Sequence, residues 1–375
     1  MTEKKKLLFI FGTRPEAIKL APLILEFRKH AHYEVKVCVT AQHREMLDQV
    51  LGFFGITPDF DLDIMQPGQS LFDVTATGLK ALEKVLAGYR PQLVFVQGDT
   101  TTSFIGALGA YYSRIRVAHV EAGLRSGNNQ SPFPEEVNRI LAGHLSDYHF
   151  TPTALSGENL RKENITKNIF MVGNTVIDAL YLSLELLKQR GEETFFRYFK
   201  NIGFTKRIVL ITGHRRESFG KPFENICGAI RTCAEKFPGV EFIYPVHLNP
   251  KVQEPVNKLL SGLKNVHLLD PLGYEYFTWL MDKSYMVLTD SGGLQEEAPA
   301  LGKPVLVMRD VTERKEGIDS GTAKLVGTDK QRIVDELSLL LEDEAAYEKM
   351  AKAVNPYGDG NACKKIVGII AKLES

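Results

Sequence analysis

The feature that most constrains the fold is a repeated alternation of short apolar runs with helical segments. In the first part of the chain the apolar runs predict strands at 7–11, 35–40, 93–96, 117–120 and 148–151. Segments with the 3.6-residue spacing of a helix separate them. Since a helix carries the chain back to the start of the next strand, this alternation predicts a parallel sheet.

The same alternation begins again after a helical region rich in Leu and Glu at 177–199. Further strands are predicted at 207–212, 240–245, 266–268, 285–289, 304–307 and 324–326. The predicted fold class is therefore α/β, with two doubly wound Rossmann-like domains at 1–172 and 173–358. We expect the last helix, within 359–375, to pack back on the first domain, and a ligand cleft between the two domains.

Composition limits the partners of the chain. The 375 residues include 46 Lys and Arg and 46 Asp and Glu, so the formal net charge is zero. The chain therefore has no overall positive charge that would attract nucleic acid or an anionic membrane surface. The apolar run after residues 1–6 is too short for a signal peptide or a membrane span, and we expect a cytoplasmic protein. The four cysteines show no Cys-x-x-Cys spacing, which favours buried free thiols.

The stretch 286–298 has the pattern of a nucleotide site. An apolar strand ends in Ser291, Gly292 and Gly293, whose backbone N–H groups at a helix start can cradle a phosphate. One of the two carboxylates that follow, Glu296 and Glu297, can accept hydrogen bonds from ribose hydroxyls. The alternative is an ordinary strand-to-helix turn in which the helix dipole favours acidic residues.

Cationic side chains follow the first strand of each predicted domain. Arg14 and Lys19 follow the run 7–11, and His214, Arg215 and Arg216 follow the run 207–212. Such positions lie at the carboxyl ends of strands, where open α/β sheets bind ligands, and clustered positive charge is costly without an anion to share it. Two other arginines, Arg309 and Arg314, either close over a diphosphate or pair with nearby acids on the surface.

Four carboxylates stand after predicted strands or at a helix start. Asp99 is either a site residue or a helix N-cap. Glu121 follows a buried strand, where a charge must be paired or functional. Glu135 and Glu136 follow a proline-rich entry to a helix, and the helix dipole alone explains acidic residues there.

The other motifs in the sequence do not indicate a cofactor site. The stretch 59–63 contains an Asp-x-Asp spacing of the kind that holds a metal–diphosphate, but it alternates like a half-buried strand and lacks further ligands, so we predict no metal site. The Gly-x-Gly at 358–360 lacks a preceding strand and a third glycine, and no Walker A motif is present. We therefore expect neither NAD nor ATP, and no other cofactor.

Six motifs together resemble those of the bacterial non-hydrolysing UDP-N-acetylglucosamine 2-epimerase family, and the resemblance covers nearly the whole chain. They are FGTRPEAIK (11–19), QGDTTT (97–102), HVEAGLR (119–125), PEEVNR (134–139), TGHRRE (212–217) and TDSGGLQEE (289–297). The resemblance implies a fold similar to that of GT-B glycosyltransferases and a homodimer. It also implies an isomerase that interconverts UDP-GlcNAc and UDP-ManNAc, as precursors of cell-surface polysaccharides.

The resemblance also assigns roles to individual residues. The catalytic set it implies is Asp99, Glu121, Glu135 and His214. The substrate-binding set it implies is Arg14, Lys19, Phe277, Ser291, Gly292, Gly293, Glu297 and Arg314, with Phe277 beside the uracil and Glu297 on the ribose. A second UDP-GlcNAc, bound as an activator, would contact Gln42, His43, Gln69, Arg215 and His247.

The expected reaction is anti elimination of UDP through a 2-acetamidoglucal, followed by re-addition, and it needs no redox cofactor. Three alternatives stay open at this point. A hydrolysing relative would release UDP and free N-acetylmannosamine, a GT-B glycosyltransferase would need an acceptor groove, and a sugar-nucleotide-binding regulator would need no catalytic residues.

Overall fold

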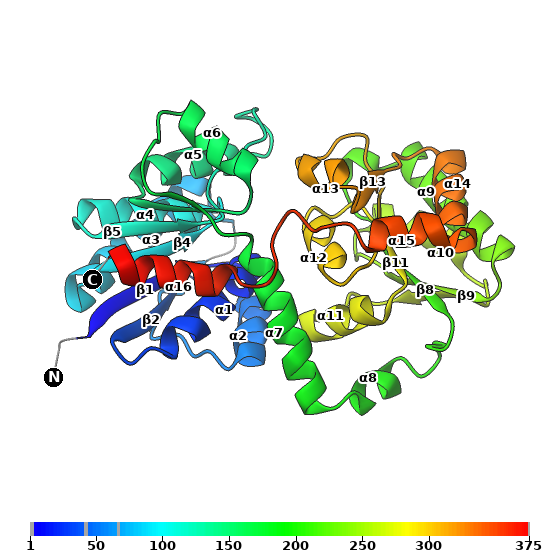
Figure 1. Ribbon diagram of the computed structural model, residues 1–375, viewed down its shortest axis with the longest axis horizontal. Helices are drawn as coiled ribbons and strands as arrows, with labels where there is room; N and C mark the ends of the chain where they lie inside the picture. Colours follow the sequence, from blue (N-terminus) through cyan, green and yellow to red (C-terminus); the bar gives the residue numbers. More distant parts are fainter. Residues whose placement is uncertain (1–3, 41–43, 66–67, 374–375) are drawn as a thin grey trace. The chain divides into compact units, whose positions relative to one another are not determined.

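The structure is a computed structural model that describes residues 4–40, 44–65 and 68–373. The chain forms two compact units, Met1–Leu182 with Tyr357–Ser375, and Ser183–Pro356. The chain passes from the first unit to the second inside helix α7 (Thr175–Arg190). Each unit contains one fully parallel sheet with helices on its faces (Figure 1). The predicted α/β class with two doubly wound domains is confirmed.

The first unit is built on a sheet with the strand order β3-β2-β1-β4-β5-β6-β7. Its strands are β1 (Lys5–Phe11), β2 (Tyr33–Val39), β3 (Phe60–Asp61), β4 (Leu93–Gln97), β5 (Arg116–Val120), β6 (Tyr148–Thr151) and β7 (Ile169–Met171). Its helices, besides the start of α7, are α1 (Arg14–Arg28), α2 (Arg44–Phe54), α3 (Leu71–Tyr89), α4 (Thr101–Tyr112), α5 (Glu135–Leu145), α6 (Ala154–Lys162) and α16 (Ala362–Leu373).

The second unit repeats this plan with the strand order β10-β9-β8-β11-β12-β13. Its strands are β8 (Arg207–Thr212), β9 (Val240–Pro245), β10 (Val266–Leu269), β11 (Met286–Thr289), β12 (Val305–Val307) and β13 (Ala323–Leu325). Its helices are α8 (Glu193–Tyr198), the 3₁₀ helix η1 (Arg216–Ser218), α9 (Lys221–Lys236), α10 (Pro250–Leu260), α11 (Tyr274–Lys283), α12 (Leu294–Ala300), α13 (Lys315–Asp319), α14 (Lys330–Glu342) and α15 (Glu344–Ala351).

The last helix belongs to the first unit although it follows the second in sequence. Helix α16 packs against α1, and Figure 1 shows it in red beside the blue N-terminal elements. Asp178 of α7 accepts hydrogen bonds from the backbone N–H groups of Ala362 (3.2 Å) and Cys363 (2.9 Å) at the start of this helix. The side chain of one helix therefore satisfies the free backbone donors of another.

Some predicted elements need correction. The stretch 59–63, which alternates like a half-buried strand, contains β3, whereas β7 is missing from the sequence prediction because it is a short, half-buried strand at the sheet edge. The predicted helical region 177–199 is two helices, since Gly191 takes φ 84°, a left-handed conformation that ends α7.

The cysteines are buried free thiols, as predicted. Cys38 lies in the core of the first unit, and Cys227 and Cys233 lie in the core of the second. Burial raises the pKa of each of these three thiols to about 12, so they stay protonated at neutral pH. No helix in the described part of the chain has the length and apolarity needed to cross a membrane.

Candidate active site

Each sheet has a switch point in its strand order, and the loops there carry predicted site residues. In the first sheet β1 and β4 are neighbours, and in the second β8 and β11 are neighbours. The connections that leave such a pair diverge, and ligands of open α/β sheets bind at the carboxyl ends of the two strands at such a point. Arg14 and Asp99 follow β1 and β4, and His214 and Ser291 follow β8 and β11.

A buried carboxylate joins the two loops at the first switch point. Glu16 is 1% exposed, and its Oε2 accepts hydrogen bonds from the backbone N–H groups of Gly12 (3.1 Å) and Thr13 (2.8 Å). Its Oε1 accepts from the hydroxyls of Thr100 (2.7 Å) and Ser103 (3.0 Å). Burial raises the pKa of Glu16, and these hydrogen bonds oppose that shift. Glu16 therefore holds the loop after β1 against the loop after β4.

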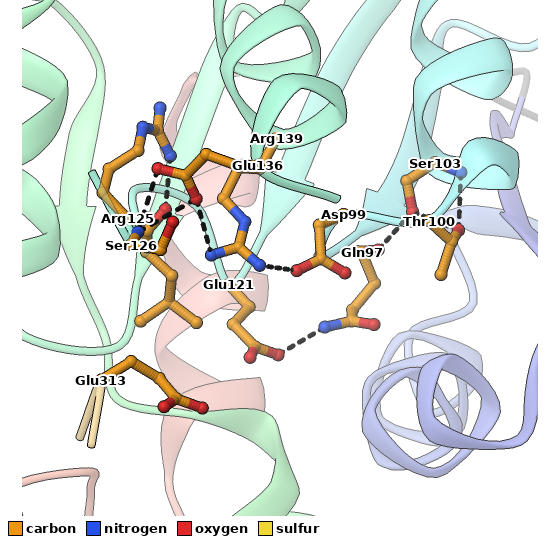
Figure 2. Close-up of polar contacts among 12 residues, drawn as sticks. Gln97, Asp99, Thr100, Ser103, Glu121, Arg125, Ser126, Glu136, Arg139 and Glu313 are labelled. Atoms are coloured by element: carbon orange, nitrogen blue, oxygen red, sulfur yellow. Dashed lines mark hydrogen bonds and ion pairs between the residues drawn. The ribbon is translucent and has the colours of Figure 1, made fainter. Parts of the chain in front are cut away.

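Asp99 does not cap the helix that follows it. The N-cap of α4 is Thr100, whose hydroxyl accepts the backbone N–H of Ser103 (3.0 Å). Asp99 forms an ion pair with Arg139 of α5, and the same guanidinium lies 3.2 Å from Glu136 (Nη1 to Oε2) (Figure 2). The N-cap alternative for Asp99 is therefore wrong. Its carboxylate is turned toward α5.

A buried histidine fixes the carbonyl that precedes Asp99. His119 of β5 is fully buried, and its Nε2 lies 2.7 Å from the oxygen of Gly98. Burial lowers the pKa of His119 to about 3, so the ring is neutral and Nε2–H donates to that carbonyl. Gly98 has φ 69°, a conformation that suits glycine. His119 thus helps to set the direction in which the loop presents Asp99.

Glu121 follows β5 in a backbone conformation that residues with a side chain rarely adopt. Its φ is 61°, which costs of order 1–3 kcal/mol for such a residue. Its buried carboxylate accepts a hydrogen bond from Gln97 of β4 (Figure 2). It also pairs with Lys19 of α1. Contacts from β4 and α1 therefore hold one carboxylate in place at a strained position, a combination that is typical of functional sites.

Glu135 is the first residue of α5 and lines a pocket of about 440 Å³ in the first unit. Arg14 and Asn138 also line this pocket, together with the apolar side chains of Met46 and Leu71. One carboxylate oxygen of Glu135 is buried and has no hydrogen-bond partner among the described residues. The geometry brings Arg14 and Glu135 together in one pocket.

In the second unit a buried aspartate orients the loop of His214. Asp290, 1% exposed, accepts the backbone N–H groups of His214 (2.6 Å) and Arg215 (2.8 Å) through Oδ2. Its Oδ1 lies 3.6 Å from Nδ1 of His214, whose ring stacks on that of His247 with centroids 5.2 Å apart. Burial lowers the pKa of His214 and the charge of Asp290 opposes this shift. The imidazole is thus held beside a fixed negative charge.

The turn after β11 is compact and partly covered by an arginine. A Cβ added to Gly292 would lie 2.9 Å from Nη1 of Arg314, so a larger residue here would displace this guanidinium. Arg314 donates to Glu296 (Nε to Oε1, 3.0 Å) and also pairs with Glu313. The carboxylate of Glu297 is the one that lies beside Gly293. Of the two acids, Glu296 is therefore engaged with an arginine and Glu297 lies at the turn.

Comparison with known proteins decides the family. The family model described as UDP-N-acetylglucosamine 2-epimerase matches residues 25–371. The chain belongs to the UDP-N-acetylglucosamine 2-epimerase family. A curated member with this name from Escherichia coli K12 is 55% identical over 367 residues, which are 96% of this chain and 97% of the relative.

Two solved structures of the family show the same fold. The UDP-GlcNAc 2-epimerase from Neisseria meningitidis, bound to UDP-GlcNAc, has a TM-score of 0.90 and 51% identity, and the match covers 98% of this chain and 100% of that chain. The UDP-GlcNAc 2-epimerase from Methanocaldococcus jannaschii, in complex with UDP-GlcNAc and UDP, has a TM-score of 0.80 and 34% identity over 98% and 99% of the chains. The predictions of the family, of an enzyme and of a GT-B-like fold are confirmed.

The remaining candidate site residues from the sequence lie at the following positions. Phe277 is half-buried on α11, and Gln69 donates from Nε2 to the carbonyl of Ile64 (2.9 Å). Gln42 and His43 lie outside the described residues. Arg309 pairs with Glu313 (3.0 Å) and with Glu217 (3.4 Å), which agrees with the surface-pair alternative for this arginine.

The described residues contain no group of side chains arranged to hold a metal ion. Asp61 of the candidate Asp-x-Asp pair accepts hydrogen bonds from Arg44 (Nη2 to Oδ1, 2.9 Å), and Arg44 also contacts Asp63 (2.8 Å). A surface ion pair therefore occupies this carboxylate.

Sequence reasoning missed several residues that position the candidate site. Glu16, Arg139 and Asp290 lie inside the motifs quoted above, but a carboxylate or guanidinium in a motif does not reveal its partner. One signal was available, since Glu136 and Arg139 are three apart on a predicted helix and so share one face. The contact between Arg139 and Asp99 had no such signal.

Proposed function

We propose that this chain interconverts UDP-GlcNAc and UDP-ManNAc by elimination of UDP and its re-addition. The observation that carries the proposal is the placement of Asp99, Glu121 and Glu135 around the first switch point, in a chain that belongs to the UDP-N-acetylglucosamine 2-epimerase family. The hydrogen on carbon 2 of the sugar is not acidic, so direct proton removal is unfavourable. Several fixed carboxylates are suited to the two proton transfers that an elimination route needs.

The proposed steps balance without a redox partner. A carboxylate takes the proton from carbon 2 while the bond between carbon 1 and the diphosphate oxygen breaks, which leaves 2-acetamidoglucal and UDP. A proton then adds to carbon 2 from the opposite face, and the diphosphate oxygen bonds again to carbon 1. The glycal must not escape, so the site must exclude water and retain both fragments.

Each unit has its own part in this proposal. In the first unit Asp99, Glu121 and Glu135 serve proton transfer and stabilisation of the intermediate, and Arg14 and Lys19 lie near the diphosphate. In the second unit His214 stabilises the leaving phosphate. Contacts to the UDP part come from Phe277, Ser291, Gly292, Gly293, Glu297 and Arg314. The ion pairs of Arg314 with Glu296 and Glu313 leave it partly neutralised before substrate binds.

Exchange with solvent tests the elimination route. In heavy water we expect the UDP-ManNAc formed from UDP-GlcNAc to carry deuterium at carbon 2, because a base on one face cannot return its proton to the other face. Proton NMR of the sugar nucleotides measures this directly. A product that keeps its original hydrogen throughout would exclude the route, and release of free N-acetylmannosamine would instead identify a hydrolysing enzyme.

We further propose a second UDP-GlcNAc as an activator, bound by Gln42, His43, Gln69, Arg215 and His247. The stacking of His247 on His214 supports this, because it couples a residue of the activator set to one of the catalytic set. We expect a sigmoidal dependence of rate on UDP-GlcNAc, and little conversion of UDP-ManNAc until some UDP-GlcNAc is added. Initial rates in both directions measure this, and hyperbolic curves in both would contradict it. A homodimer stays a prediction.

A further inference from the structure

Helix α5 presents an unusual pair of polar groups to the pocket of the first unit. Glu135 and Asn138 are three residues apart, so they lie on the same face of this helix, and both line the pocket. Asn138 is 8% exposed, and its amide nitrogen is buried without a hydrogen-bond partner among the described residues. A buried carboxylate oxygen of Glu135 also lacks a partner in that part of the chain.

Unpartnered polar atoms of this kind are costly. A buried donor or acceptor without a hydrogen bond loses the bonds that water would give it, and most buried polar groups in proteins are paired. Here a donor and an acceptor without partners lie on one helix face beside a pocket. A ligand that offers one acceptor and one donor would satisfy both, which neither a fully ionised phosphate nor an apolar group can do.

The pocket wall also has an apolar part. Met46 and Leu71 line the same pocket and are 42% and 44% exposed, so they offer apolar surface to a ligand. A secondary amide with a methyl group matches all three features. Its carbonyl accepts a hydrogen bond, its N–H donates one, and its methyl group prefers apolar contact. The acetamido group of an N-acetylhexosamine is such an amide.

Resting on the proposed function, we propose that Asn138 is the residue that selects the acetamido group of the substrate. Its amide nitrogen donates to the acetamido carbonyl, Glu135 accepts from the acetamido N–H, and the methyl group contacts Met46 and Leu71. This arrangement gives Glu135 a positioning role in addition to its part in proton transfer. Its hydrogen bond with the acetamido N–H orients carbon 2, which carries that nitrogen. UDP-glucose has a hydroxyl at that carbon, in which a single oxygen both donates and accepts, and it has no methyl group, so it cannot replace the separate carbonyl, N–H and methyl contacts of the acetamido group.

The variant Asn138→Leu tests this proposal because it removes the amide while keeping a similar volume. We expect displacement of labelled UDP by UDP-GlcNAc to require a roughly tenfold higher concentration, as the loss of a neutral hydrogen bond predicts. Displacement by unlabelled UDP and by UDP-glucose should change less than about twofold. Since the amide nitrogen has no partner among the described residues, the melting temperature should stay the same or rise.

Two further variants complete the test. Asn138→Ala should show the same selective loss, and Leu141→Ala, at a 40% exposed position on the same helix, should change none of the three affinities. Equal weakening of all three ligands, no weakening of any, or a lower melting temperature with unchanged affinities would each overturn the proposal. A wild-type protein that binds UDP-GlcNAc better than UDP-glucose without converting it would contradict the proposed reaction alone.

Discussion

Glu121→Gln should lower the turnover of UDP-GlcNAc at least about a hundredfold while the affinity for UDP stays nearly unchanged. A positioned acid or base contributes roughly a hundredfold to ten-thousandfold to rate, and glutamine keeps the shape of the side chain but cannot take a proton. Glu121 is also 7% exposed and held by Gln97 and Lys19, so water has little access to act in its place. Coupled turnover assays and calorimetry with UDP measure the two quantities.

Variants at other positions separate catalysis from binding. Asp99→Asn and Glu135→Gln should follow the pattern of Glu121→Gln. Glu297→Ala in the second unit should instead weaken UDP binding. The loss of a charged acceptor costs about 1.5–3 kcal/mol, which raises the dissociation constant of UDP roughly tenfold to hundredfold. Full turnover in a folded Glu121→Gln protein would remove this residue from the reaction.

Arg139→Ala should cost about 3–5 kcal/mol in the free energy of unfolding of the first unit, besides a loss of activity. Arg139 is the cation between two carboxylates, and its side chain is 12% exposed while that of Glu136 is 2% exposed. Without Arg139, Glu136 keeps its hydrogen bonds from the backbone N–H groups of Ser126 (3.0 Å) and Gly127 (2.9 Å). These bonds should bring the cost toward the lower end of the range. Chemical denaturation measures it.

The matched control is Arg231→Ala on α9. Arg231 pairs with Glu235 at 2.9 Å, but both side chains are about half exposed, at 49% and 54%. Water and salt screen such a pair, so its loss should cost less than about 1 kcal/mol. Equal costs for Arg139→Ala and Arg231→Ala would show that burial of the cluster around Arg139 does not contribute as proposed. Arg139→Lys should recover part of the stability, because it keeps the charge without the two-armed geometry.

Local patterns were enough to predict the order of elements and the residues at strand ends. The apolar runs that became β1, β4, β8 and β11 are nearly continuous, as expected for strands buried on both faces. Gly98, Asp99 and Ser291 could be assigned to loops because small and polar residues interrupt those runs. The family assignment is correct because it uses several such loops together, whereas each motif alone is too short to identify a family.

The sequence by itself determined that this chain forms two parallel sheets, and which polar residues end their strands. Only the tertiary structure decided which of those residues meet. The placement of β4 beside β1, with β2 and β3 on the other side, depends on packing between distant segments, which periodicity along the chain does not record. The same holds for the bridge from Glu16 to Thr100, the pairing of Arg139 with Asp99, and the positive φ of Glu121. Each is set by neighbours far away in sequence.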